Sequence, residues 1–304
     1  MPISRNMKGS LMLLLCAIIW GFAFTAQDIL ADTVPVFACG AVRSLIAAVA
    51  LAVTVTVFDK AEHTGRSLFS RKKNPLTKRE LLGGAACGAA LAIATAFQQA
   101  GIATSGASKA AFITAMYVVL VPMAGALIFG RRTHLRIWIA VIIAICGVGL
   151  ITLSEDLSLA KGDILIFICA FCFCGQILLV DHFLPGSDGI RLSMVQFASG
   201  GIMNLILSLI FESVDLAAIA AMILPLAYLG LMSSGCAYTL QILGQRYCPP
   251  APAAILMSTE ALFGALGAAL VLGEVLTVRE YVGCAVVFFA VILSQLPSKK
   301  ETPA

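Results

Sequence analysis

Apolar residues run through this chain in long blocks that short polar segments interrupt. Each block is long enough to cross a bilayer as a helix, because a hydrocarbon core about 30 Å thick needs roughly 20 apolar residues. Backbone groups in lipid must bond within their own segment, so helices rather than strands are expected. The pattern predicts ten spans, at residues 10–29, 34–58, 80–104, 108–129, 135–153, 162–181, 190–211, 221–245, 250–272 and 277–296.

Composition is typical of a membrane-embedded chain and excludes a soluble one. Hydrophobic residues make up 60% of the 304 residues, charged residues only 12%, and the mean hydropathy is +1.00. No soluble core could bury so much apolar surface. The first block is too long for the hydrophobic part of a signal peptide and lacks a convincing cleavage site, so we expect it to remain as a span. No extramembrane domain is expected.

Positive charges predict the orientation, because short cytoplasmic loops hold an excess of Lys and Arg. If the loops alternate from a cytoplasmic N-terminus, only Lys161 and Arg279 of the 20 Lys and Arg residues lie on the far side. Arg43 and Lys109 fall within spans. Both termini are then cytoplasmic. We interpret the basic cluster at residues 60–79 as an orientation determinant, so no nucleic-acid partner is expected.

Weak internal similarity divides the chain into two halves. At a displacement of 143 residues, the segment 126–130 matches 269–273, and Gln98 matches Gln241. Two halves of five spans each must enter the membrane from opposite sides, because five is odd. This gives an inverted repeat, the architecture on which many secondary transporters build alternating access. Tandem duplication in a structural membrane protein is the alternative.

The predicted fold is therefore an all-α membrane protein with ten transmembrane helices in two inverted five-helix repeats. Its predicted parts are a cytoplasmic N-terminus at residues 1–9, a first repeat at 10–153, a second repeat at 162–296 and a cytoplasmic tail at 297–304. The plasma membrane is the expected location.

Glu260 is the charged residue placed deepest in a predicted span. It lies ten residues into the ninth span, near mid-membrane at 1.5 Å of rise per residue. A carboxylate there costs about 2.5–3.5 kcal/mol unless it is paired, hydrated or protonated, so it must face the bundle interior or a wet cavity. Two interpretations stay open. Glu260 carries protons or acts as a counter-ion for a cationic group, or it forms a fixed ion pair with Arg43.

Other polar and aromatic residues within the spans mark a candidate cavity. Gln241 belongs to a polar stripe at helical spacing along the eighth span, and its repeat partner Gln98 ends a weaker stripe in the third. Amphipathic rings deep in a bundle, such as Trp20, need a partner for their polar group. The predicted lining of the cavity is Trp20, Gln98, Thr114, Tyr117, Gln176, Tyr238, Gln241 and Glu260. Interhelical hydrogen bonding of the glutamines and packing of the rings in the core are the alternatives.

The cysteines do not predict a metal site. Cys169, Cys172 and Cys174 lie close in sequence, but on a helix the second and third differ by roughly 200° in direction. No His or carboxylate lies among them to complete a ligand set. We therefore expect neither a metal nor another cofactor.

Short motifs along residues 10–296 carry a family resemblance. They are Ile19-Trp20-Gly21, Arg43-Ser44-Leu45-Ile46-Ala47-Ala48, Ser108-Lys109-Ala110-Ala111-Phe112-Ile113-Thr114-Ala115-Met116-Tyr117, Val121-Pro122, Tyr228-Leu229-Gly230, Ala237-Tyr238, Gln241, Gln245-Arg246, Glu260 and Leu272-Gly273-Glu274. With these motifs in this order, the chain resembles the EamA-like transporters of the drug/metabolite transporter superfamily. Members of that family typically carry a Glu-Pro pair in the ninth helix, where this chain has Glu260-Ala261.

The resemblance implies ten helices in two inverted halves around a central cavity for small metabolites. The predicted function is a secondary transporter that exports or exchanges amino acids or related small metabolites by alternating access. No ATP-binding motif is present, so a gradient should drive transport. A flippase for a lipid or lipid-linked sugar is the alternative, and an enzyme is not expected. The expected partners are a small-molecule substrate and the lipid bilayer; protons and a homodimer are left open.

Overall fold

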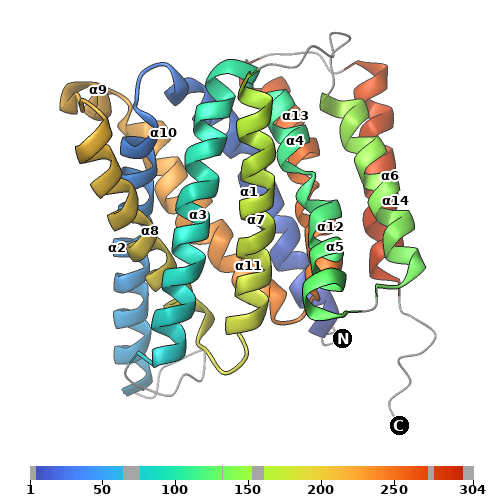
Figure 1. Ribbon diagram of the computed structural model, residues 1–304, viewed down its shortest axis with the longest axis horizontal. Coiled ribbons are helices and arrows are strands. Elements are labelled where there is room, and N and C mark those ends of the chain that lie inside the picture. Colours follow the sequence, from blue (N-terminus) through green and yellow to red (C-terminus); the bar gives the residue numbers. More distant parts are fainter. Residues whose placement is uncertain (1–4, 64–75, 132, 153–160, 273–276, 297–304) are drawn as a thin grey trace.

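The computed structural model describes residues 5–63, 76–131, 133–152, 161–272 and 277–296, and the regular structure within them is helical (Figure 1). The first half contains α1 (Arg5–Ala31), α2 (Val36–His63), α3 (Lys78–Ser105), α4 (Ala107–Thr114), α5 (Tyr117–Phe129) and α6 (Leu135–Thr152). The second half contains α7 (Lys161–Phe183), α8 (Gly189–Phe211), α9 (Leu216–Ala221), α10 (Ile223–Ala227), the π-helix η1 (Tyr228–Ala237), α11 (Tyr238–Gln245), α12 (Pro250–Met257), α13 (Glu260–Leu272) and α14 (Val278–Gln295).

These helices, singly or joined end to end, form segments of transmembrane length and composition. Within the described residues, eight helical segments are long and apolar enough to cross a bilayer, and the segment Leu135–Ile151 is apolar but shorter. The chain is therefore a multi-pass, all-α membrane protein, as its hydropathy predicts. The predicted span 250–272 is divided between α12 and α13, and the count of ten spans stays a prediction. The side chains at 60–75 and 297–304, which include seven of the sixteen Lys and Arg residues placed on the inner side, lie outside the described part.

The bundle has a helix pair at each end and a packed centre. Figure 1 shows α6 and α14 together at one end, α2 and α8 at the other, and α1, α3 and α7 between them. Glycines permit the closest crossings, as small residues do between membrane helices. A Cβ built on Gly283 of α14 would lie 2.8 Å from the carbonyl oxygen of Gly147 in α6, so a side chain there would force the two helices apart.

Two of the helical spans are broken at equivalent points. The residues Ala115 and Met116 separate α4 from α5, and Ser258 and Thr259 separate α12 from α13. These pairs lie 143 residues apart, the displacement of the internal similarity. At each break Met116 or Thr259 donates its N–H to the carbonyl three residues earlier, at 3.1 and 3.3 Å, instead of the carbonyl four residues earlier. One tight turn thus interrupts each helix at mid-span.

Side-chain hydroxyls help to form the break in the ninth span. Ser258 and Thr259 each donate to the carbonyl three residues earlier, at 2.8 and 2.7 Å. Such bonds offer the backbone an alternative to the helical ladder. The break therefore forms without a proline after Glu260. In the fourth span, α5 continues through Pro122, and the break lies upstream of that proline.

The two broken spans run in opposite directions. Figure 1 places α4 and α13 at one level of the bundle and α5 and α12 at the other. Contacts between the helices agree, because α4 packs against α13 and α5 against α12. The first piece of each broken span therefore lies beside the second piece of the other.

The π-helix η1 is a feature that the sequence pattern did not predict. It spans ten residues, whereas π-helices are rare and occur mostly as single turns inside α-helices, frequently at functional sites. Its glycines face α2: a Cβ on Gly230 would meet the side chain of Ile46 at 2.7 Å. The π-helix thus packs closely against α2, the helix that contains Arg43.

Candidate functional site

A cavity lies where the broken helices meet. The empty space within it is about 430 Å³ when the space at its opening is counted. All nine residues that the sequence singled out line it, namely Trp20, Arg43, Gln98, Thr114, Tyr117, Gln176, Tyr238, Gln241 and Glu260. They come from eight separate elements, which only the folded bundle brings together.

The wall also contains residues that sequence reasoning missed. These are Ala23, Phe24, Gln27, Phe173, Ile177 and Ser233. Gln27 and Ser233 carried a usable signal, because both are polar residues within predicted spans. The apolar members had none, since nothing distinguishes an apolar side chain that faces a cavity from one that faces a neighbouring helix.

The two broken helices contact each other through their first residues. Tyr117 begins α5 and Glu260 begins α13, and the phenol oxygen of Tyr117 donates to Oε1 of Glu260 at 3.1 Å. Glu260 is only 4% exposed. A carboxylate in the first turn of a helix is stabilised by the positive end of the helix dipole. This is the one hydrogen bond that the described residues give to the Glu260 side chain.

Arg43 is buried in the same cavity but binds other groups. Its Nε donates to Oγ of Ser234 and its Nη2 to Oγ of Ser233, both at 3.0 Å. These are neutral hydroxyls on consecutive residues of the π-helix. In this conformation the described residues contain no ion pair between Arg43 and Glu260. The cavity therefore has one guanidinium and one carboxyl group in its wall, each bonded to hydroxyl groups.

An amide cluster lies on the α1–α3 side of the cavity. Nε2 of Gln27 donates to Oε1 of Gln98 at 3.1 Å and, more weakly, to Oε1 of Gln99 at 3.4 Å. Gln98 donates in turn to Oγ1 of Thr114 at 3.3 Å, and Gln99 to the backbone oxygen of Gln27 at 2.9 Å. The interhelical hydrogen bonds expected as an alternative for Gln98 are thus present, and its side chain also lines the cavity.

A second amide cluster lies on the α7–α11 side. Gln176 donates to Gln196 at 3.0 Å and accepts from Gln241 at 3.0 Å. Gln245 donates to the backbone oxygen of Ile177 at 3.0 Å. Gln98 and Gln241, the residues matched by the internal similarity, therefore lie in separate clusters. The first cluster lies towards the C-terminal end of α1 and the second towards the C-terminal end of α11.

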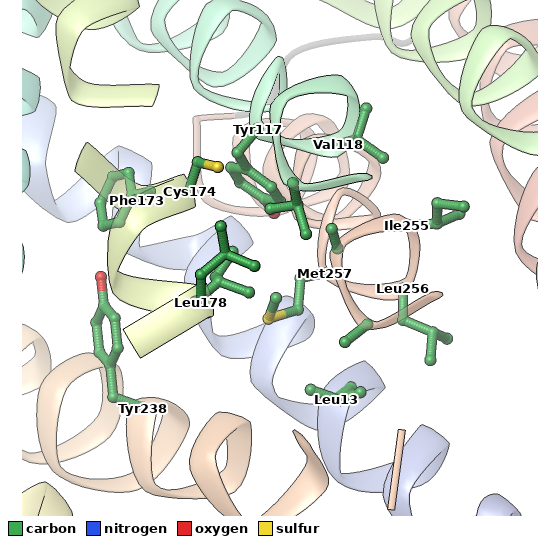
Figure 2. Close-up of a cluster of buried hydrophobic side chains, with 14 of the residues drawn as sticks. Leu13, Tyr117, Val118, Phe173, Cys174, Leu178, Tyr238, Ile255, Leu256 and Met257 are labelled. Atoms are coloured by element: carbon green, nitrogen blue, oxygen red, sulfur yellow. The ribbon is translucent and has the colours of Figure 1, made fainter. Parts of the chain in front are cut away.

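Aromatic rings form the apolar part of the wall. The rings of Trp20 and Tyr238 lie 4.5 Å apart, and Nε1 of Trp20 donates to the backbone oxygen of Ser233 at 3.3 Å. Figure 2 shows Tyr117, Phe173 and Tyr238 together with Leu178 and Met257 in one buried cluster. The rings of Tyr117 and Tyr238 therefore pack in the core and also line the cavity, so the two interpretations of these residues hold at once.

Comparison with known proteins places this architecture in a family. The model of the EamA-like transporter family matches residues 7–153 and again 160–296. A protein of Archaeoglobus fulgidus, named as an uncharacterized transporter, is 27% identical over 292 residues, which cover 96% of this chain and 87% of that one. A solved crystal structure of a protein matches with a TM-score of 0.74 and 13% identity, covering 94% of this chain and 96% of that chain. This last likeness concerns the fold alone.

Fold, cavity and relatives together define a multi-pass membrane transporter, and they point away from an enzyme. The chain belongs to the EamA-like transporter family, because the family model matches almost all of it. The resemblance inferred from the sequence motifs is thus confirmed. A transporter of this kind binds a small-molecule substrate and lies in a lipid bilayer.

Proposed function

We propose that the protein is a secondary transporter that exports or exchanges amino acids or related small metabolites across the plasma membrane by alternating access. Its architecture in this proposal is ten transmembrane helices in two inverted five-helix repeats, residues 10–153 and 162–296. Both termini are cytoplasmic in this arrangement, since the Lys and Arg residues then lie mostly on the inner side.

The pairing of helices supports the inverted repeat. α3 packs along α7, and its repeat counterpart, η1 with α11, packs along α1, the counterpart of α7. The pairs α2 with α8 and α6 with α14 each join a helix to its own counterpart. Exchanging the two halves therefore reproduces the pattern of contacts. The antiparallel course of the two broken spans and the double match of the family model support the same proposal.

One observation carries the functional proposal: the cavity lies at the breaks of two antiparallel helices. Discontinuous helices at the interface of inverted repeats form the substrate sites of many secondary transporters. Each break is a single turn that lacks part of the helical hydrogen-bond pattern. A small change in the backbone angles of that turn would therefore tilt one piece of the helix against the other. The halves could then close one side of the cavity while they open the other.

Glu260 is the group proposed to couple this movement to a gradient. It lies at the break itself and is bonded to the equivalent residue of the other half, Tyr117. A change in its protonation or its partner would therefore act directly on the contact between the two broken helices. The notion of a fixed ion pair with Arg43 receives no support from this conformation, because Arg43 binds Ser233 and Ser234.

Counterflow in reconstituted vesicles tests the proposal. Vesicles that contain the purified protein and are loaded with an unlabelled mixture of amino acids should accumulate labelled amino acids from outside. Vesicles that contain the protein but no amino acids should not. Metabolite profiling of media from overexpressing and deleted cells should show the same solutes. Translocation of labelled lipids without counterflow of any soluble metabolite would favour the flippase instead.

A further inference from the structure

We infer that Arg43 and Glu260 are two halves of one recognition site, which selects a small zwitterion bearing a carboxylate and an ammonium group. This inference rests on the proposed function and narrows it to neutral amino acids with an apolar side chain. Arg43 binds the carboxylate in this arrangement, and Glu260 with Tyr117 binds the ammonium group.

The first argument is the charge of the cavity. Of the side chains that line it, Arg43 is the one cationic group and Glu260 the one carboxyl group, and each is 4% exposed. Buried charges are costly unless they are paired, and these two are not paired with each other within the described structure. A ligand of net charge zero with separated charges neutralises both at once. A simple amine or a simple acid would leave one of them uncompensated.

The geometry of Arg43 fits a carboxylate. A guanidinium has five N–H donors in a planar fork, and two of them are used by Ser233 and Ser234. No other described group bonds to Arg43. The serines fix the plane of the guanidinium while its other donors stay available to the cavity that it lines. Planar, bidentate binding of a carboxylate is the interaction that distinguishes Arg from Lys.

The π-helix explains how two consecutive serines reach one guanidinium. A π-helix has more residues in each turn than an α-helix, so successive side chains are separated by a smaller angle. Ser233 and Ser234 therefore point more nearly in one direction than they would in an α-helix. Trp20 donates to the backbone oxygen of Ser233, which ties the same turn to α1.

The environment of Glu260 fits an ammonium group. Tyr117 occupies Oε1, and the described residues give no partner to Oε2. The rings of Trp20 and Tyr238 lie in the same wall, and aromatic faces attract ammonium groups. Phe24, Phe173 and Ile177 complete an apolar wall that suits an uncharged side chain.

Three probes that share one apolar side chain test this inference in counterflow. We would compare L-leucine with isopentylamine, which lacks the carboxylate, and 4-methylpentanoate, which lacks the amine, and repeat the series with L-phenylalanine, phenethylamine and 3-phenylpropionate. We expect the amino acid to be carried at least about tenfold faster than either analogue, because a site built for a polar group rejects ligands that lack it. An analogue carried as fast as the amino acid overturns the inference, and so does failure to carry either amino acid.

Variants assign the two charges. Arg43→Gln should remove most amino-acid counterflow and lessen discrimination against the amines, whereas Glu260→Gln should lessen discrimination against the acids. Arg43→Lys keeps the charge but loses the fork, so it should raise KM more than it lowers the maximal rate. Arg131→Gln, which removes an exposed cation outside the cavity, is the matched control. Equal losses for all three probes in both cavity variants would show a structural role and overturn the assignment.

The proposed function fails in a different way. If metabolite profiling finds export of solutes that are not zwitterions, the transporter proposal stands and the inference is wrong. If neither profiling nor counterflow detects any soluble metabolite, both are wrong.

Discussion

Tyr117 and Glu260 are equivalent residues of the two halves, and they are hydrogen-bonded to each other at 3.1 Å. Each is the first residue of the second piece of a broken span, and they lie 143 positions apart, the displacement of the internal similarity. In the proposed inverted repeat, two equivalent residues that touch lie next to the axis that relates the halves. The hydrogen bond therefore joins the broken helices at the centre of the bundle. A movement of either half relative to the other would change its length.

Replacing Tyr117 with Phe should weaken the junction of the broken helices without removing its packing. The variant loses one hydrogen bond to a carboxylate, so unfolding of the purified protein should become easier by about 1–3 kcal/mol. The maximal rate of counterflow should fall as well, because the two halves lose a direct connection. Tyr281→Phe, at an exposed position of α14, is the control and should leave both quantities unchanged. A Tyr117→Phe protein with normal rate and stability would contradict the importance of this contact.

Removing the charge of Glu260 should uncouple transport from protons. We expect the residual transport of Glu260→Gln in vesicles to stop responding to an imposed pH gradient, because glutamine cannot exchange a proton. The wild-type protein and Asp32→Asn, which alters an exposed acid, should both respond. A Glu260→Gln protein that transports normally, with unchanged pH dependence, would remove this acid from the mechanism.

The hydroxyls at the break of the ninth span should matter for movement more than for stability. Ser258→Ala with Thr259→Ala removes the two bonds to earlier carbonyls and favours a continuous helix. We expect thermal stability to stay equal or rise, and the transport rate to fall about tenfold, which corresponds to roughly 1.4 kcal/mol in activation free energy.

Two threonines of α2 provide a matched control for the Ser258 and Thr259 changes. Thr54 and Thr56 also donate to earlier carbonyls, at 2.8 Å each, but within an unbroken helix away from the cavity. Replacing both with Ala should leave the transport rate close to that of the wild type. If the Thr54 and Thr56 changes slow transport as much as the Ser258 and Thr259 changes do, the break has no special role.

Among the amides of the second cluster, Gln176 should be the one whose replacement lowers the stability of the protein most. It bonds to both Gln196 and Gln241, so Gln176→Leu leaves two buried amides without their partner, at a cost of about 1–3 kcal/mol each. Unfolding of the purified protein in detergent should measure this loss. The triple change of all three glutamines to Leu should cost less than Gln176→Leu alone, because no orphaned amide remains. A triple variant less stable than the single one would contradict this explanation.

Hydropathy by itself determined the all-helical membrane class, because the cost of placing polar groups in lipid depends on each segment alone. Rare polar residues within spans were also informative for the same reason: each must avoid lipid, so all nine predicted residues face the interior, where they line one cavity. Gln27 could have been found in this way, since it too lies within a predicted span. The family resemblance rested on short motifs at fixed spacing and needed no tertiary information.

Which groups bond to which was decided only by tertiary structure. The sequence allowed Arg43 to pair with Glu260, but the rotation of α2 against the π-helix brings Ser233 and Ser234 to the guanidinium instead. The break before Tyr117 lies upstream of Pro122, although the proline is the stronger local signal. Helix rotation, tilt and the placement of breaks are set by packing against neighbouring helices, which hydropathy along a single segment does not contain.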